Sequence, residues 1–377
     1  MSAVYRNAMI TISATASRSG DEGLFRQCPE VLVRPRVRES PTFVFHPPRI
    51  HMDRYSVSQE EFPLLSRAWA LQERLLSLRV LHFTNTELVF ECITDQRCEC
   101  KGIRDVDWRD SIQQTKCHLA GWMPHSGPTE IWEDVVMQYS NRQLSYPSDK
   151  LVAIAGLAKN FRHPGHRYLA GLWANGLIDQ LQWFVRGKEL PIQARPTWRA
   201  PSWSWAAVQT PVHYYFLNRL RPSTESYSAA TAEVLNCSVV SNNADPYVEV
   251  LSGTLQLLAR STQVSWKRIA QPPDDWRGND LNCIIFPSGY QIGFYLDALI
   301  DGRPSPGTEA ENLDITCVLL AEDYCFRHRR LLVLRRLDSD KNIFERIGLA
   351  YEMRRRGLFM ENADNIFPKE RIVVEIV

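Results

Sequence analysis

The sequence predicts an α+β protein, with helices in its first part and middle and antiparallel strands towards its C-terminal end. Apolar side chains recur at helical spacing in residues 63–76, 129–144 and 149–161. The period changes in residues 208–377, where short apolar or alternating runs are separated by turn residues. Hydrophobic residues make up 44% and charged residues 23% of the 377 residues, as in ordinary globular proteins.

Composition and spacing divide the chain into four expected segments. We expect residues 1–92 to form part of an α/β domain and residues 128–207 to form a helical region. Residues 93–127 are polar and predict a variable surface insertion, which Trp108 and Trp122 anchor. Residues 208–377 predict an antiparallel sheet or a small sandwich.

Two early stretches are apolar enough to predict structure. Residues 8–16 are small, weakly polar and continuous, so they are expected to be buried on several sides by elements that precede them. The chain is therefore expected to begin midway through its first domain. Residues 42–46 predict a short strand within a proline-rich and arginine-rich loop.

Residues 63–83 are the centre of the predicted first domain. Pro63 suits the first position of a helix, and Trp69 and Gln72 lie on its apolar face, which predicts that Trp69 is buried. After residue 76 the pattern predicts two strands, residues 79–83 and 87–92, joined by a short turn.

The later elements follow the same two periods. Apolar positions at Leu177, Leu181, Phe184 and Val185 predict a further helix that ends near residue 186. The strands predicted beyond residue 208 are 229–239, 247–259, 283–286, 290–295, 314–321, 330–335 and 344–351.

Composition excludes several classes of function. The formal net charge is +1, which gives no basis for binding nucleic acid or a membrane surface. No apolar run approaches the roughly 18 residues of a membrane span. The first residues lack the pattern of a secretory signal, and the nine cysteines are scattered, so reduced thiols and a cytoplasmic location are expected. The oligomeric state stays open.

Three groups of residues were weighed as sites and assigned structural roles. Cys92, Cys98, Cys100 and Cys117 with His118 lack zinc-ligand spacing, so neither a metal nor a cofactor is expected. Trp198, Trp203 and Trp205 are expected to pack structurally rather than to stack on a ligand. The arginines 354–356 are expected to form a solvated strand end.

The central stretch resembles the end of the fungal heterokaryon-incompatibility (HET) domain. That family's motif is Arg-x-Trp-x-x-Gln-Glu, then Leu-Ser, Arg, a Leu-His-Phe strand and a closing Glu-Cys. The matching residues are Arg67, Trp69, Gln72, Glu73, Leu76, Ser77, Arg79, Leu81, His82, Phe83, Glu91 and Cys92. The sequence departs from the motif at Leu78, where the family often has proline. Residues 144–151, 168–173 and 199–206 also resemble phrases found downstream of that domain.

The resemblance implies a self/non-self recognition and cell-death signalling module with a protein partner, whose active surface includes Trp69, Gln72 and Glu73. Two motifs expected earlier in the domain are absent, which implies truncation and leaves open that no function remains. The HET fold has been related to the Toll/interleukin-receptor (TIR) fold, some members of which cleave NAD with a glutamate. That relation makes Glu73 a candidate catalytic acid. The alternative is a structural Glu73 that bonds backbone or pairs with Arg67 or Arg79, and we expect no enzyme activity.

Overall fold

The chain folds into two compact α+β units. Unit 1 comprises residues 1–146 and 159–161, and unit 2 comprises residues 147–158 and 162–377, a division that differs from the four expected segments. The computed structural model describes residues 2–26, 31–33, 43–45, 60–99, 111–122, 127–162, 165–186, 191–215, 228–242, 245–270, 281–311, 313–323, 328–338, 341–352 and 363–377. Within these ranges no helix has both the length and the apolar character needed to span a membrane.

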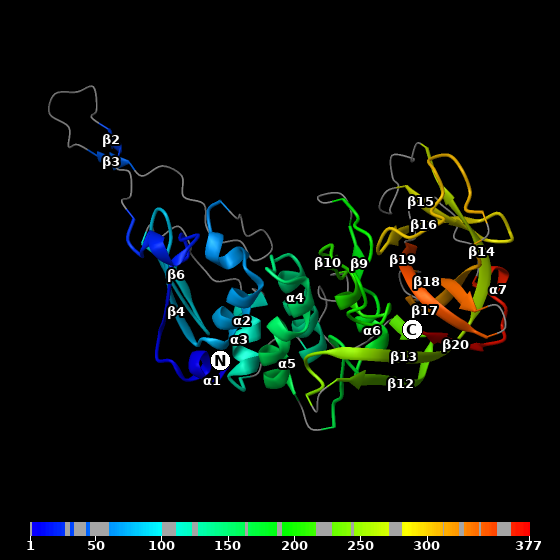
Figure 1. Ribbon diagram of the computed structural model, residues 1–377, viewed down its shortest axis with the longest axis horizontal. Helices are drawn as coiled ribbons and strands as arrows, with labels where there is room; N and C mark the ends of the chain where they lie inside the picture. The colour runs from blue at the N-terminus through cyan, green and yellow to red at the C-terminus, as the bar shows by residue number, and fades with distance from the viewer. Residues whose placement is uncertain are drawn as a thin grey trace. The chain divides into compact units, whose positions relative to one another are not determined.

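Unit 1 contains a four-stranded sheet with the order β1-β4-β5-β6 (Figure 1). Its strands are β1 (Thr11–Ser13), β4 (Arg79–Phe83), β5 (Leu88–Cys92) and β6 (Gln96–Cys98). The predicted hairpin is confirmed, because β4 and β5 pair antiparallel with His82 opposite Val89. Strand β1 pairs parallel with β4. A separate hairpin joins β2 (Val31–Val33) to β3 (Phe43–Phe45), and β3 confirms the short strand expected at residues 42–46.

The helices of unit 1 supply most of its apolar core. They are α1 (Ser2–Asn7), α2 (Ala68–Leu76), α3 (Ser111–Leu119), α4 (Pro128–Ser140) and the last turn of α5 (Ala155–Phe161), with 3₁₀ turns η1 (Gly20–Glu22) and η2 (Pro63–Ser66). Helix α4 begins at Pro128, which needs no hydrogen bond for its nitrogen at a first helical position. Trp132 of α4 is fully buried, with its ring 5.2 Å from that of Phe161.

The helix predicted at residues 63–76 is interrupted. Pro63–Ser66 form a 3₁₀ turn, Arg67 is extended, and α2 begins only at Ala68. The cause is a tertiary contact that spacing does not reveal. The Ala68 N–H donates to the Gln143 carbonyl at 2.8 Å, and the Gln143 N–H donates to the Ser66 carbonyl at 2.8 Å. Trp69 is consequently only half-buried, and the prediction that it is buried is wrong.

Two further expectations for unit 1 are wrong. Residues 93–127 were expected to be a surface insertion, yet they contain β6 and helix α3, whose Lys116 is fully buried. Trp122 does not anchor them, since it is 56% exposed, and Trp108 lies outside the described residues. Residues 8–16 were expected to be buried on several sides. Strand β1 instead lies at an edge of the described sheet, and Ile12 is 52% exposed.

Unit 2 is dominated by a ten-stranded sheet that confirms the β-rich prediction (Figure 1). Strands β14 to β19 form a closed ring of antiparallel pairs, because β18 pairs with both β17 and β19. The sheet contains β11 (Ser228–Ala230), β12 (Glu233–Ser241), β13 (Val250–Ala259), β14 (Ser261–Arg268), β15 (Asn282–Ile285), β16 (Gln291–Leu296), β17 (Ile315–Asp323), β18 (His328–Asp338), β19 (Ile343–Glu352) and β20 (Ile372–Ile376). Strands β14 and β20 were not predicted.

Short elements precede this sheet in unit 2. They are η3 (Pro147–Lys150), η4 (Val152–Ile154), the first turn of α5, β7 (Tyr168–Leu169), β8 (Leu172–Trp173), α6 (Leu177–Gln180), β9 (Phe184–Val185), η5 (Trp205–Ala207) and β10 (Val212–His213); α7 (Ala363–Ile366) lies between β19 and β20. The helix predicted at residues 149–161 is therefore two 3₁₀ turns followed by α5.

The helix predicted from Leu177 to Val185 ends at Gln180, so that prediction is also largely wrong. The guanidinium of Arg346 on β19 donates to the carbonyls of Leu181 and Trp183, two groups that a continuing helix would use. The chain therefore leaves the helix and forms β9, which pairs with β10.

The tryptophans of residues 199–206 pack as expected. Trp203 and Trp205 are fully buried, but Trp198 is 55% exposed, so the expectation that it packs in the core with them is wrong. The Trp205 indole N–H donates to the Gly171 carbonyl at 2.8 Å. Gly171 has a φ of 102°, and a Cβ there would lie 2.8 Å from the Trp205 nitrogen, so only glycine fits this approach. Residues 168–173 and 199–206, two of the three downstream phrases noted in the sequence, thus contact one another.

Candidate functional site

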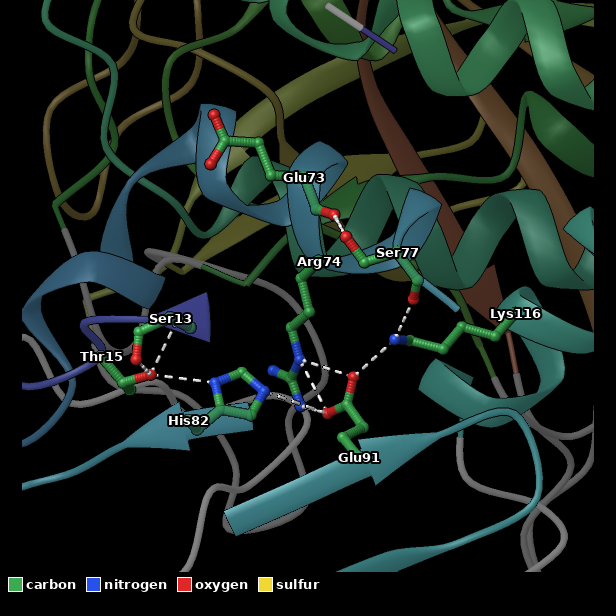
Figure 2. A network of polar contacts seen from close by, with 8 residues as sticks. All are labelled: Ser13, Thr15, Glu73, Arg74, Ser77, His82, Glu91 and Lys116. Atoms are coloured by element: carbon green, nitrogen blue, oxygen red, sulfur yellow. Dashed lines mark hydrogen bonds and ion pairs between the residues drawn. The ribbon is translucent and has the colours of Figure 1, made fainter. Parts of the chain in front are cut away.

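Helix α2 lies over a buried polar network whose centre is Glu91 on β5 (Figure 2). Strand residues alternate between two faces of a sheet, so Val89 and Glu91 of β5 point to the same side and are both buried. His82 of β4 is placed inward by the same alternation. A carboxylate in an apolar position needs charged partners, because burying it alone would cost several kcal/mol.

Two cations provide those partners. The Arg74 Nε of α2 donates to Glu91 Oε2 at 2.9 Å, and an Arg74 Nη contacts the same oxygen. The Lys116 ammonium of α3 lies 3.0 Å from Glu91 Oε1 and donates to the Ser77 carbonyl at 2.6 Å. Arg74, Glu91 and Lys116 therefore join α2, β5 and α3 through one carboxylate.

Hydroxyl groups extend the network to β1. His82 Nδ1 lies 2.9 Å from the Thr15 hydroxyl, which lies 2.9 Å from the Ser13 hydroxyl. His82 Nε2 is 3.7 Å from Glu91 Oε2, an ion-pair distance that is longer than a hydrogen bond. The Ser77 hydroxyl donates to the Glu73 carbonyl at 2.7 Å. The end of α2 is joined to the sheet by the Arg74–Glu91 pair and by the Ser77 hydroxyl, which lies 2.8 Å from the Thr11 hydroxyl of β1.

The protonation of the network follows from burial and charge. Burial raises the pKa of Glu91, but Arg74 and Lys116 outweigh it and hold the pKa well below its ordinary value. Burial lowers the pKa of Lys116, and Glu91 opposes that shift. Burial also lowers the pKa of His82, with Arg74 and Lys116 acting in the same direction and Glu91 against it. The imidazole is therefore neutral at pH 7.

Glu73 lies outside this network. Its side chain points away from the Arg74–Glu91 pair (Figure 2) and is half-buried. Burial raises the pKa of Glu73, while a hydrogen bond from Tyr5 and the charge of Arg67 lower it. Arg79 donates to the Met9 carbonyl instead, and Arg74 is held by Glu91. Of the arginines near it in sequence, only Arg67 acts on Glu73, and without direct contact.

A cleft of about 550 Å³ lies beside the N-terminal end of α2. It is lined by Arg18, Glu60, Pro63, Ser66, Arg67, Trp69, Gln143, Leu144 and Ser145. Of the motif residues singled out in the sequence, Arg67 and Trp69 line this cleft, whereas Gln72, Glu73 and Arg79 do not. Arg18 and Arg67 are exposed, and Trp69 is partly exposed.

Gln72 contributes to the packing of α2. Its side chain is buried, and its amide oxygen has no hydrogen-bond partner in the described part of the chain. The cysteine and histidine residues weighed for zinc are dispersed: within the described ranges no three His, Cys, Asp or Glu side chains are placed together to hold a metal ion. Cys100 and the arginines 354–356 lie outside the described residues.

Sequence reasoning missed Lys116, Arg18 and Glu60 as members of these two sites. Glu91 and His82 were noted only as matches to a family motif, although strand alternation on β4 and β5 places both on the buried side. No signal in the sequence marks Lys116 as buried, because it lies in a polar stretch. No family model, curated protein or solved structure matches the chain.

Proposed function

We propose that unit 1 is a recognition module of the heterokaryon-incompatibility type, acting in the cytoplasm in self/non-self discrimination and cell-death signalling. One observation supports this function above others: the motif residues divide into a buried set and an accessible set. Glu91 holds α2 through Arg74, and Ser77 contacts Thr11 of β1, with His82 buried beside Glu91, whereas Arg67 and Trp69 line an open cleft at the start of α2. A rigid scaffold beneath an accessible cleft suits the binding of a partner.

A cell-based experiment tests this function. The chain is expressed in a filamentous fungus, and dead compartments are counted with a vital dye. A variant with Arg67→Ala and Trp69→Ala is expected to lower the fraction of dead compartments at least ~5-fold, the loss that about 1 kcal/mol of binding energy gives. Arg97→Ala, a change at an exposed arginine that does not line the cleft, is the matched control.

Immunoblotting must show equal amounts of the three proteins. If the native chain kills no more compartments than an empty vector, the module is inactive and the proposal fails. Equal killing by the native chain and by the double variant would also reject the cleft as its active surface.

The second candidate is an NAD-hydrolysing enzyme that uses Glu73. The raised pKa of this half-buried carboxyl favours it, because catalytic acids often have perturbed pKa values. A catalytic acid must also reach its substrate within hydrogen-bonding distance. Glu73 does not line the cleft, so we expect a structural role.

Nicotinamide release from NAD separates the two functions. We expect the purified native chain and Glu73→Gln to give the same background signal. Turnover by the native chain that Glu73→Gln abolishes would reverse the choice and make Glu73 the catalytic acid.

A further inference from the structure

We propose that the cleft beside α2 binds an acidic, extended peptide segment of the protein partner. The inference rests on the proposed function and specifies the chemistry that the partner must present. Three features of the lining support the proposal: two arginine side chains, an apolar wall, and a short length of backbone that forms no hydrogen bond to the described residues.

The two arginines are available for a ligand. The guanidinium groups of Arg18 and Arg67 form no ion pair and no hydrogen bond within the part of the chain that the structure describes, and both side chains are exposed at the cleft. A guanidinium pairs with a carboxylate through two parallel hydrogen bonds, which gives direction as well as affinity. Two such groups in one cleft fit a segment with two carboxylates.

The apolar wall is provided by Trp69, with Pro63 and Leu144 in the same lining. Trp69 is half-buried, so its indole is held in place and still offers a face. An aromatic or aliphatic side chain of a peptide can pack on that face, and aromatic pairs contribute roughly 0.5–1.5 kcal/mol beyond the area that they bury. The expected segment therefore carries an apolar residue beside its acidic ones.

The backbone at the cleft is suited to pairing with a peptide. Arg67 is extended and forms a parallel bridge with Gln143, whose own N–H and carbonyl are both used within unit 1. The next residues, Leu144 and Ser145, make no backbone hydrogen bond to the described residues. A peptide in an extended conformation can use these groups as a further strand would.

The lining suits a nucleotide less well. Phosphate sites commonly use several backbone N–H groups in a glycine-rich turn, and no glycine is among the described residues that line this cleft. Glu60 also places a carboxylate in the cleft, which repels a ligand with several negative charges at one end. A peptide avoids this conflict, because its backbone N–H groups can donate to Glu60.

Fluorescence anisotropy with a labelled peptide tests the proposal on the full chain. The probe is fluorescein-Gly-Asp-Phe-Asp-Gly-Ser, and the matched probe has Asn in place of both Asp residues. We expect the acidic probe to bind at least ~10-fold more tightly, with Arg18→Gln or Arg67→Gln each weakening it by about 5-fold, the scale of one exposed charge pair. Arg97→Gln is expected to leave binding unchanged.

Competing ligands complete the test. Equal affinity for the two probes, no binding of either probe, or displacement of the acidic probe by less ATP or NAD than unlabelled peptide would each overturn the proposal. The substituted side chains are exposed, so these changes are expected to leave the fold intact. An unchanged melting temperature shows that each variant folds. If the probe fails to bind but the Arg67 and Trp69 changes still prevent cell death, the ligand class is wrong and the proposed function stands. If the acidic probe binds but the Arg67 and Trp69 changes have no effect on cell death, the proposed function is rejected and the proposed class of ligand stands.

Discussion

At the scale of single residues, unit 1 depends on Glu91 more than on Glu73. The family resemblance makes Glu73 a candidate catalytic acid, and the structural alternative predicts that Arg67 or Arg79 pairs with it. In the structure Arg74 forms an ion pair with Glu91, which is fully buried, whereas Glu73 is half-buried. Neighbours in sequence on a helix point in different directions, so proximity along the chain did not identify the pair.

The first prediction compares the two glutamates. Glu91→Gln removes the charge that compensates Arg74 and Lys116, and breaking a buried pair in this way is expected to cost about 3–5 kcal/mol. Glu73→Gln is expected to cost less than ~1 kcal/mol, because the group is partly solvated. Hydrogen exchange of peptides from β4 and β5, followed through a urea titration, measures both. Equal losses for the two variants would contradict the assignment.

The second prediction concerns pH and His82. Burial lowers the pKa of His82 in the folded state, so the unfolded chain, with an ordinary histidine pKa of ~6.5, binds a proton first as the pH falls. The free energy of unfolding therefore falls as the pH drops below ~6.5. His82 contributes at most about 1.4 kcal/mol to this loss for each pH unit. Urea midpoints of unit 1 at pH 7.5 and pH 5.5 measure the loss. His82→Gln is expected to reduce the difference between the two urea midpoints. If that difference is unchanged in the variant, groups other than His82 cause the loss of stability.

At the scale of elements, periodicity located the helices better than it located their ends. The helix of residues 63–76 was predicted because its apolar stripe is real, but Gln143 takes the hydrogen bond of Ala68 and the first turn becomes 3₁₀. The helix predicted after Leu177 ends early because Arg346 captures two of its carbonyls. Helix α3 was missed because its buried residues are polar. In each case a residue distant in sequence decides the local structure, and no local pattern can report it.

The third prediction compares two helices. Trp132→Ala in α4 removes a fully buried ring and is expected to cost about 3–5 kcal/mol. Trp69→Ala in α2 is expected to cost less, because Trp69 is only partly buried and lines the cleft. Hydrogen exchange in unit 1 gives both values under the same conditions. A loss of unfolding free energy for Trp69→Ala as large as that for Trp132→Ala would mean that the apolar face of α2 containing Trp69 is buried, as the sequence alone predicts.

At the scale of the whole molecule, the α+β class and the β-rich C-terminal region were predictable, and the division into two units was not. Turn residues every few positions revealed most strands of unit 2. The closure of the ring by β18 depends on which strands pair, and that information is absent from a single strand's pattern. The boundary at residue 146 falls within the expected helical region of residues 128–207, and α5 contributes residues to both units.

The fourth prediction tests the two units by calorimetry of the full chain. Asp297 and Arg346 form a fully buried pair in unit 2, with Asp297 Oδ2 2.8 Å from the Arg346 Nε. Asp297→Asn is expected to lower one melting transition by roughly 5–15 °C and to leave the other in place. Glu91→Gln is expected to lower the second transition instead. A single transition that both variants shift equally would show that the units unfold together.

The way α5 is shared has a consequence for synthesis on the ribosome. The ring of Phe161 lies 5.2 Å from that of Trp132 and 4.5 Å from that of His118, so unit 1 lacks part of its core until residue 161 has been made. By then residues 147–158, which belong to unit 2, have already been translated. The two units are thus interleaved in the order of translation. A nascent chain halted at residue 146 would leave Trp132 of α4 without the ring of Phe161, so unit 1 can complete its core only after the last turn of α5 has been translated.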